Sequence, residues 1–118
     1  MAAPNLSRPS GIYGHTVAMT CGVNDQEVIA NSAGSNKILK INVIRLASIA
    51  ESNTYASAKI TKGATSVYLI KDALVLPRSS FVVLDKNEYL YLEEGDSLWI
   101  KASASTSIDA MIHYEEIL

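Results

Sequence analysis

His113 lies close in the sequence to two carboxylates and could contribute to a metal site. Asp109 and Glu115 are each an even number of residues away from it, and residues at even spacing share one face of a β-strand. Imidazole nitrogen and carboxylate oxygen both bind Zn²⁺, but a protein zinc site needs three or more converging ligands. The other histidine, His15, is distant in the sequence. We therefore predict a solvent-facing polar strip at His113, with no metal and no cofactor.

Cys21 is the only cysteine, so an intrachain disulfide and a cysteine-based zinc or iron–sulfur site are excluded. A thiol paired with a histidine can act as a nucleophile when its surroundings stabilise the thiolate. No helix start follows Cys21, and its neighbours at even spacing are Met19 and Val17. This pattern predicts a small buried apolar residue. We expect no catalytic residues in this chain and no enzymatic activity.

Two acidic pairs, Glu93-Glu94 and Glu115-Glu116, could indicate calcium binding or paired-carboxylate catalysis. A calcium loop needs acidic residues at alternating positions and a terminal Glu at a fixed distance. The segment 93–96 lacks that spacing. It predicts a hairpin turn in which Gly95 adopts a positive φ and Asp96 starts the next strand.

Three aromatic residues form the remaining candidate site. Trp99 is expected on the outward face of its strand, and Tyr89 and Tyr91 lie on the preceding strand. Such a group could be a flat aromatic platform on which a sugar ring stacks. Trp and Tyr are also enriched in buried protein interfaces, so the same residues could instead form a subunit contact. The sequence favours the subunit contact and leaves the carbohydrate-binding module as an alternative.

Composition limits the partners of this protein. The chain has 118 residues, a formal net charge of -2, 48% hydrophobic residues and only 19% charged residues, whereas an ordinary globular domain has about 25% charged residues. Intrinsic disorder is excluded by the hydrophobicity, and nucleic-acid binding is not expected without a positive field. The N-terminus does not resemble a signal peptide, and no apolar run approaches the roughly 20 residues that span a bilayer. We therefore expect neither nucleic acid nor membrane as a partner.

The spacing of turn residues predicts an all-β chain. Short runs of Val, Ile, Thr and Tyr are separated by turn signals about every 8–12 residues, which is typical of a sandwich or barrel. We predict one antiparallel β-sandwich over residues 12–118, jelly-roll-like or immunoglobulin-like, of about eight or nine strands. Residues 1–11 have no periodicity and are predicted to form a flexible, extended arm. The predicted strands span 12–21, 26–30, 37–48, 54–61, 65–73, 79–85, 88–92, 97–105 and 107–116.

Two predicted strands contain continuous apolar runs, Val67–Ile70 and Phe81–Leu84. A two-sheet sandwich covers only one face of each strand, so an apolar second face indicates coverage by another subunit. Together with the low charge density, this predicts a homo-oligomer. The candidate interface residues are Leu6, Arg8, Tyr13, Tyr68, Ile70, Tyr89, Tyr91 and Trp99.

The C-terminal half of the chain carries a familiar pattern. The segment 67–81 contains the turn Leu76-Pro77-Arg78-Ser79-Ser80, the segment 90–103 contains Leu92-Glu93-Glu94-Gly95-Asp96-Ser97-Leu98, and the chain closes with the tyrosine-acidic strand 108–117. This pattern resembles small all-β virion proteins of tailed bacteriophages, particularly those of marine and cyanobacterial phages.

The resemblance implies a structural subunit of a phage particle, assembled in the host cytoplasm. It implies a capsid decoration (cement) protein that binds copies of itself and the major capsid protein, with a trimer as the expected oligomer. A neck, tail or fibre-attachment subunit is the alternative within this class. The resemblance transfers no catalytic residues.

Overall fold

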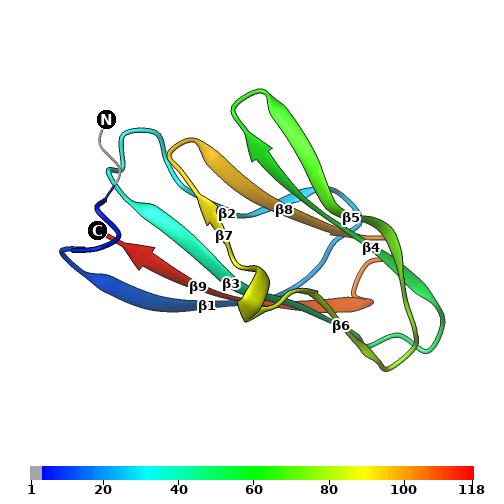
Figure 1. Ribbon diagram of the computed structural model, residues 1–118. Coiled ribbons are helices and arrows are strands. Elements are labelled where there is room, and N and C mark those ends of the chain that lie inside the picture. The colour runs from blue at the N-terminus through cyan, green and yellow to red at the C-terminus, as the bar shows by residue number, and fades with distance from the viewer. Residues whose placement is uncertain (1–3) are drawn as a thin grey trace.

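The computed structural model describes residues 4–118 and consists of two packed antiparallel β-sheets (Figure 1). The strands are β1 (Ile12–Thr20), β2 (Gln26–Ala30), β3 (Ile38–Ser48), β4 (Thr54–Lys62), β5 (Thr65–Val75), β6 (Ser80–Leu84), β7 (Leu90–Leu92), β8 (Asp96–Ala102) and β9 (Ile108–Ile117). Among the described residues, the only helical element is the short 3₁₀ turn η1 (Lys86–Glu88), and no helix could cross a membrane. The predicted all-β sandwich is confirmed.

The strand order identifies the topology. Sheet A has the order β1-β9-β3-β6, with β7 also paired to β3, and sheet B has the order β2-β8-β4-β5. β6 and β7 pair with different halves of β3, so they act as one interrupted strand. The antiparallel pairs are then nested: the first strand with the last, the second with the last but one, and so on inward to the β4–β5 hairpin. This is the jelly roll, one of the two predicted sandwich types.

Three predicted strand boundaries were wrong by more than one residue. The strand predicted to end at residue 73 continues to Val75, and the other two differ for local reasons. The strand predicted from residue 88 begins at Leu90, because the Asp85 carboxylate accepts the Asn87 N–H (2.8 Å) and caps η1. The strand predicted to reach residue 105 ends at Ala102, because residues 103–107 form a turn that the Ser107 hydroxyl closes on the Ala104 carbonyl (2.6 Å).

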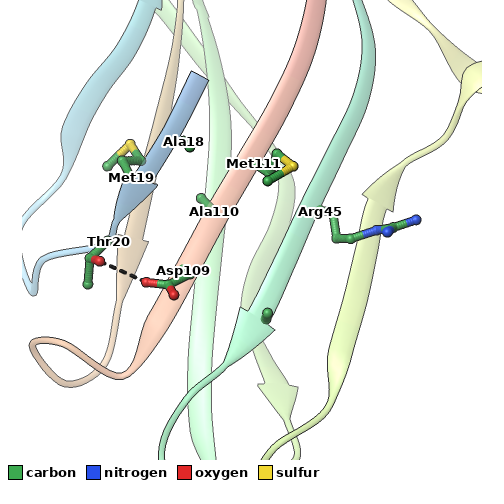
Figure 2. Close-up of a pocket in the computed structure, with 8 residues that line it drawn as sticks. Ala18, Met19, Thr20, Arg45, Asp109, Ala110 and Met111 are labelled. Atoms are coloured by element: carbon green, nitrogen blue, oxygen red, sulfur yellow. Dashed lines mark hydrogen bonds between the residues drawn. The ribbon is translucent and has the colours of Figure 1, made fainter. Parts of the chain in front are cut away.

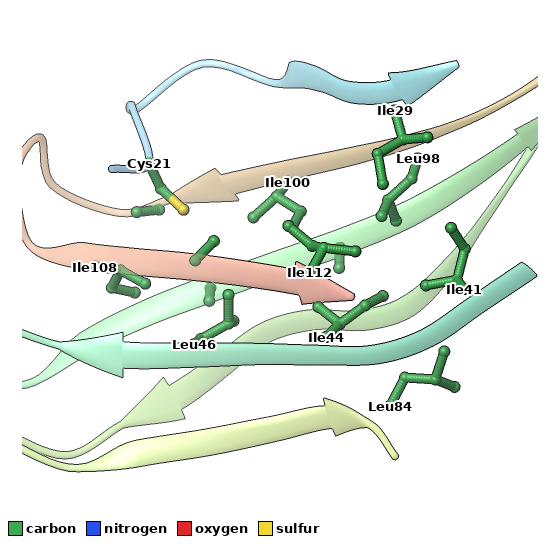
Figure 3. Close-up of a cluster of buried hydrophobic side chains, with 14 of the residues drawn as sticks. Cys21, Ile29, Ile41, Ile44, Leu46, Leu84, Leu98, Ile100, Ile108 and Ile112 are labelled. Atoms are coloured by element: carbon green, nitrogen blue, oxygen red, sulfur yellow. The ribbon is translucent and has the colours of Figure 1, made fainter. Parts of the chain in front are cut away.

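The core between the sheets is almost entirely aliphatic (Figure 3). On β9, Ile108, Ala110 and Ile112 point inward as the alternation predicts, and all three are buried. On sheet B, alanines occupy several core positions, including Ala56 and Ala58 on β4. These alanines and the branched side chains of sheet A belong to one buried cluster, and protein interiors pack large and small residues to high density.

One buried polar residue joins the loops at one end of the sandwich. Asn31 follows β2 and is 1% exposed. Its side-chain N–H groups donate to the carbonyls of Lys37 (2.8 Å) and Leu92 (2.9 Å), and its side-chain oxygen accepts from the Ser35 hydroxyl. Its backbone N–H also donates to the Asp96 carbonyl (2.9 Å). Asn31 therefore fixes the 31–37 loop to the turn between β7 and β8.

Candidate functional site

The outer face of sheet B carries a row of side chains that contains two predicted interface residues. Strand pairing places Trp99 (β8) beside Lys59 (β4), and Lys59 beside Tyr68 (β5). On its other side, Trp99 is paired with Glu27 of β2. We call Trp99, Lys59 and Tyr68 the aromatic row. It crosses the sheet perpendicular to the strands, and all three side chains point away from the core.

One ion pair, one hydrogen bond and two lysine–aromatic contacts hold the aromatic row in place. The Lys59 Nζ lies 5.7 Å from the centroid of the Trp99 ring and 3.0 Å from the Asp25 carboxylate. The Trp99 indole N–H donates to the Ser97 hydroxyl (2.8 Å), so its one polar group is satisfied. At the other end of the row, the Lys71 Nζ lies 5.2 Å from the Tyr68 ring centroid. The row presents ordered aromatic surface flanked by both signs of charge.

Tyr89 and Tyr91 do not join Trp99. Tyr91 lies on β7 in sheet A, with Tyr89 just before it, and Trp99 lies on β8 in sheet B. The predicted platform of these three residues is therefore not formed. The reason is that the 93–96 turn passes from one sheet to the other, although Gly95 has the positive φ expected of a tight turn (+89°). A short turn with hairpin chemistry does not require that its two strands pair.

The two tyrosines form their own cluster on the sheet A side. Their rings pack edge to face with centroids 5.6 Å apart, and the Lys40 Nζ lies 4.3 Å from the centroid of Tyr89. Tyr91 is paired with Lys40 across the β3–β7 ladder, so the cluster faces outward. Sequence reasoning identified these residues but not the lysine that covers one ring.

Ile70 and Tyr68 are separated by an irregularity in β5. Ile70 packs against the core, whereas Tyr68 is 43% exposed. Val82, in the other predicted two-sided run, is 47% exposed. Both apolar runs lie on strands at a sheet border, and within residues 4–118 their outward side chains Tyr68 and Val82 stay largely accessible. Coverage by a second subunit stays a prediction.

Tyr13 lies on β1 of sheet A and is paired with Glu116 of β9, and Leu6 and Arg8 lie in the segment before β1, so none of the three belongs to the aromatic row. Residues 1–3 of the predicted arm lie outside the described residues. The remainder contains a turn in which the Arg8 N–H donates to the Asn5 carbonyl (3.0 Å), and the Ser10 N–H donates to the Leu118 carbonyl (2.7 Å). The end of the predicted arm, residues 10–11, is therefore bonded to the C-terminal residue, and ordering of the arm against a neighbour stays a prediction.

The candidates for metal binding and nucleophilic catalysis have structural partners. The His113 Nδ1 lies 3.2 Å from the Thr16 hydroxyl, and Asp109 accepts from the Thr20 hydroxyl (2.7 Å). Within residues 4–118, no three potential ligands converge on a metal position. Cys21 is 2% exposed, and burial, assisted by the negative charge of Asp109, raises the pKa of its thiol to about 11. At neutral pH this thiol is protonated and is a poor nucleophile.

His15 belongs to a cluster that the sequence did not reveal. Its ring stacks on Tyr114 with centroids 5.0 Å apart, and its Nε2 lies 3.4 Å from Glu116. Glu116 also pairs with Lys37. The Lys37 ammonium and, more weakly, His15 hold the pKa of the Glu116 carboxyl below its ordinary value. The cluster joins β1, β9 and the segment before β3, and its partners are separated by many residues in the sequence.

A hollow of about 530 Å³ lies on the outer face of sheet A (Figure 2). The small side chains of Ala18 and Ala47 leave space in it, and Met111 on β9 lies between Ala18 and Arg45. Its polar groups are the bonded pair Thr20–Asp109 and the exposed Arg45, which reaches toward β6. No histidine or cysteine lines it, so its chemistry fits contact with a side chain better than catalysis. Comparison of the sequence with protein-family models and with curated proteins gives no match.

Proposed function

We propose that this protein is a structural subunit of a tailed-phage particle, a head decoration protein that stabilises the shell through symmetric subunit contacts. The phage assignment rests on the sequence resemblance in the C-terminal half. The observation that carries the assembly role is the aromatic row, which is ordered and outward-facing. Trp and Tyr contribute more binding energy at interfaces than most other residues.

The distribution of the predicted interface residues supports contacts between unlike surfaces. Trp99 and Tyr68 lie on sheet B, whereas Tyr89 and Tyr91 lie on sheet A. In a ring of identical subunits, one patch of each copy meets a different patch of the next copy. Two separated aromatic clusters fit such an arrangement, and the expected trimer would have it.

The fold is compatible with the proposal but does not decide it. Jelly rolls occur in viral capsid domains and also in lectins, and a fold alone does not establish a function. The surface chemistry supports assembly because the candidate nucleophile, Cys21, is buried and the histidines contact structural partners. A neck, tail or fibre-attachment subunit would use the same kind of surface.

Co-expression with the major capsid protein of the same genome tests the proposal. We expect the protein to co-sediment with assembled shells and Trp99→Ala to reduce the bound amount. Tyr55→Ala is a control, because Tyr55 is an aromatic residue on β4 of the same sheet, is exposed, and lies outside the aromatic row. A protein that never sediments with shells would contradict the decoration role.

A carbohydrate-binding module remains the second candidate, in a changed form. The aromatic row places Trp99 and Tyr68 on one face, with the acidic residues Asp25 and Glu27 beside it. Aromatic rings flanked by hydrogen-bonding groups can hold a sugar. Binding on a glycan array that Trp99→Ala abolishes, without any association with shells, would favour this function.

A further inference from the structure

The four borders of the two sheets differ in how they are protected against pairing with another strand. Unpaired edge strands are usually short, bulged, charged or covered, because their free backbone groups can pair with another chain. β2 has only five residues, includes Glu27 and has a register shift. The β6–β7 border is interrupted by η1.

β5 is long but is also protected. Its pairing with β4 contains two register shifts. At one of them, Asp72 has a positive φ of 49° and its N–H donates to the Ser57 hydroxyl (2.9 Å). Such bulges bend and twist an edge strand and thereby discourage pairing.

β1, the outer strand of sheet A, has none of these protections (Figure 1). Its nine residues pair with β9 in an unbroken register. It contains no Lys, Arg, Asp, Glu or Pro. Beyond it, the Leu118 N–H donates to the Gly11 carbonyl and the Cys21 N–H donates to the Ile108 carbonyl, so the odd-numbered residues bond to β9. Because bonded residues alternate in an antiparallel ladder, the even-numbered residues from Ile12 to Thr20 direct their N–H and C=O groups to the free side.

Gly14 is a second, independent indication. A Cβ built at Gly14 would meet no atom within 4 Å, and its φ is not positive. The single chain therefore has no steric need for glycine in the middle of this strand, where glycine weakens pairing. A glycine inside a strand often marks the close approach of another backbone.

We propose that β1 pairs in antiparallel fashion with β1 of a second copy, with Thr16 on the two-fold axis. Thr16 is the midpoint of Ile12–Thr20, so this register pairs all the free backbone groups of one strand with those of the other. The two A sheets would then form one continuous sheet. This inference does not depend on the phage assignment.

The side chains are compatible with this register. Tyr13 would lie opposite Met19 of the second copy, and His15 opposite Val17. Tyr13 is 54% exposed in the single chain, and a thioether against an aromatic ring is a favourable contact. On the other face, Gly14 would lie opposite Ala18, so two small residues meet there. No pair brings like formal charges together.

The dimer would leave sheet B free. The aromatic row lies on β8, β4 and β5, none of which belongs to sheet A. A β1 contact and a contact through the aromatic row can therefore coexist in one assembly. Trp99→Ala should leave β1 pairing unchanged, so the two proposals can fail separately.

The first test removes one free donor from β1. The Thr16 N–H points away from β9, so Thr16→Pro should preserve the monomer fold while it removes two hydrogen bonds across the two-fold axis. Sedimentation equilibrium of the full chain across a concentration series should show dimerisation weakened by about 30-fold. Thr16→Ser keeps the N–H and should dimerise like the wild type. Circular dichroism checks that both variants are folded.

The second test identifies the symmetry axis and does not depend on the proline variant. Thr16→Lys and Thr16→Glu should each weaken self-association, because like charges would face each other across the axis. Mixed together, they should form one-to-one heterodimers, detectable by native mass spectrometry. A wild-type protein that stays monomeric at every concentration would overturn the proposal. A dimer that Thr16→Pro and the two charged variants all leave intact would also overturn it.

Discussion

The two faces of β8 differ completely in what covers them. The inward residues Leu98, Ile100 and Ala102 are at most 1% exposed, because sheet A closes over them. The outward residues include Trp99 and Lys101, which remain partly accessible. Both faces are ordered, but only the inner one is completed by this chain. The difference indicates that the inner face determines stability and the outer face is available to a partner.

Truncation of Ile100 should have the largest effect on folding. Ile100→Ala removes a fully buried side chain and leaves a cavity between the sheets, which costs about 2–5 kcal/mol. Urea denaturation monitored by Trp99 fluorescence measures the free energy of unfolding. If this variant were as stable as the wild type, the inner face would not have the role that we assign to it.

Loss of the Asn31 side chain should have the next largest effect. Asn31→Ala leaves the Lys37 and Leu92 carbonyls without their donor, and an unsatisfied buried polar group costs roughly 1–3 kcal/mol. The matched control is Asn42→Ala, because Asn42 makes one part-buried bond to Glu115 (3.2 Å). We expect the control to retain more stability. Equal losses would show that the 31–37 loop is not held by Asn31.

The strands were predictable from the sequence, but their partners were not. Alternation on β9 correctly placed Ile108, Ala110 and Ile112 inward, because a strand with one buried face has a period of two. The 93–96 turn looked like a hairpin, yet it crosses between the sheets. Local turn chemistry fixes the reversal of the chain, whereas long-range packing decides which strands become neighbours.

The candidate site shows the same limit. Trp99 and Tyr68 were each recognisable as outward aromatic residues, but their alignment through Lys59 depends on the registers of β8, β4 and β5. The His15 cluster could not be predicted for the same reason, because Glu116 lies 101 residues from His15 along the chain. A single sequence records residue types and local periodicity, and it does not record register between distant strands.

The Glu116 ion pair should give a smaller, pH-dependent effect. The pKa of Glu116 is below its ordinary value of 4.5 in the folded protein, so the pairing contributes stability above about pH 4.5, and this contribution is lost as the pH falls through the folded-state pKa. Glu116→Gln should therefore be less stable than the wild type at neutral pH, by under about 1 kcal/mol, and the difference should shrink in acid. In a Lys37→Met background the difference should be smaller at every pH. A difference that grows in acid would contradict the assignment.

Removal of the Lys59 charge should have the smallest effect on folding. Lys59 lies on β4 beside Trp99, so this variant tests whether the outer face around Trp99 contributes to stability. Lys59→Met keeps the aliphatic stem beside Trp99 but removes the ion pair with Asp25. Because solvent screens such pairs, the free energy of unfolding should change by no more than about 1 kcal/mol. A loss as large as that of Ile100→Ala would mean that the outer face also holds the fold together. If the variant keeps its stability but binds shells less well, the aromatic row serves a partner and not the chain itself.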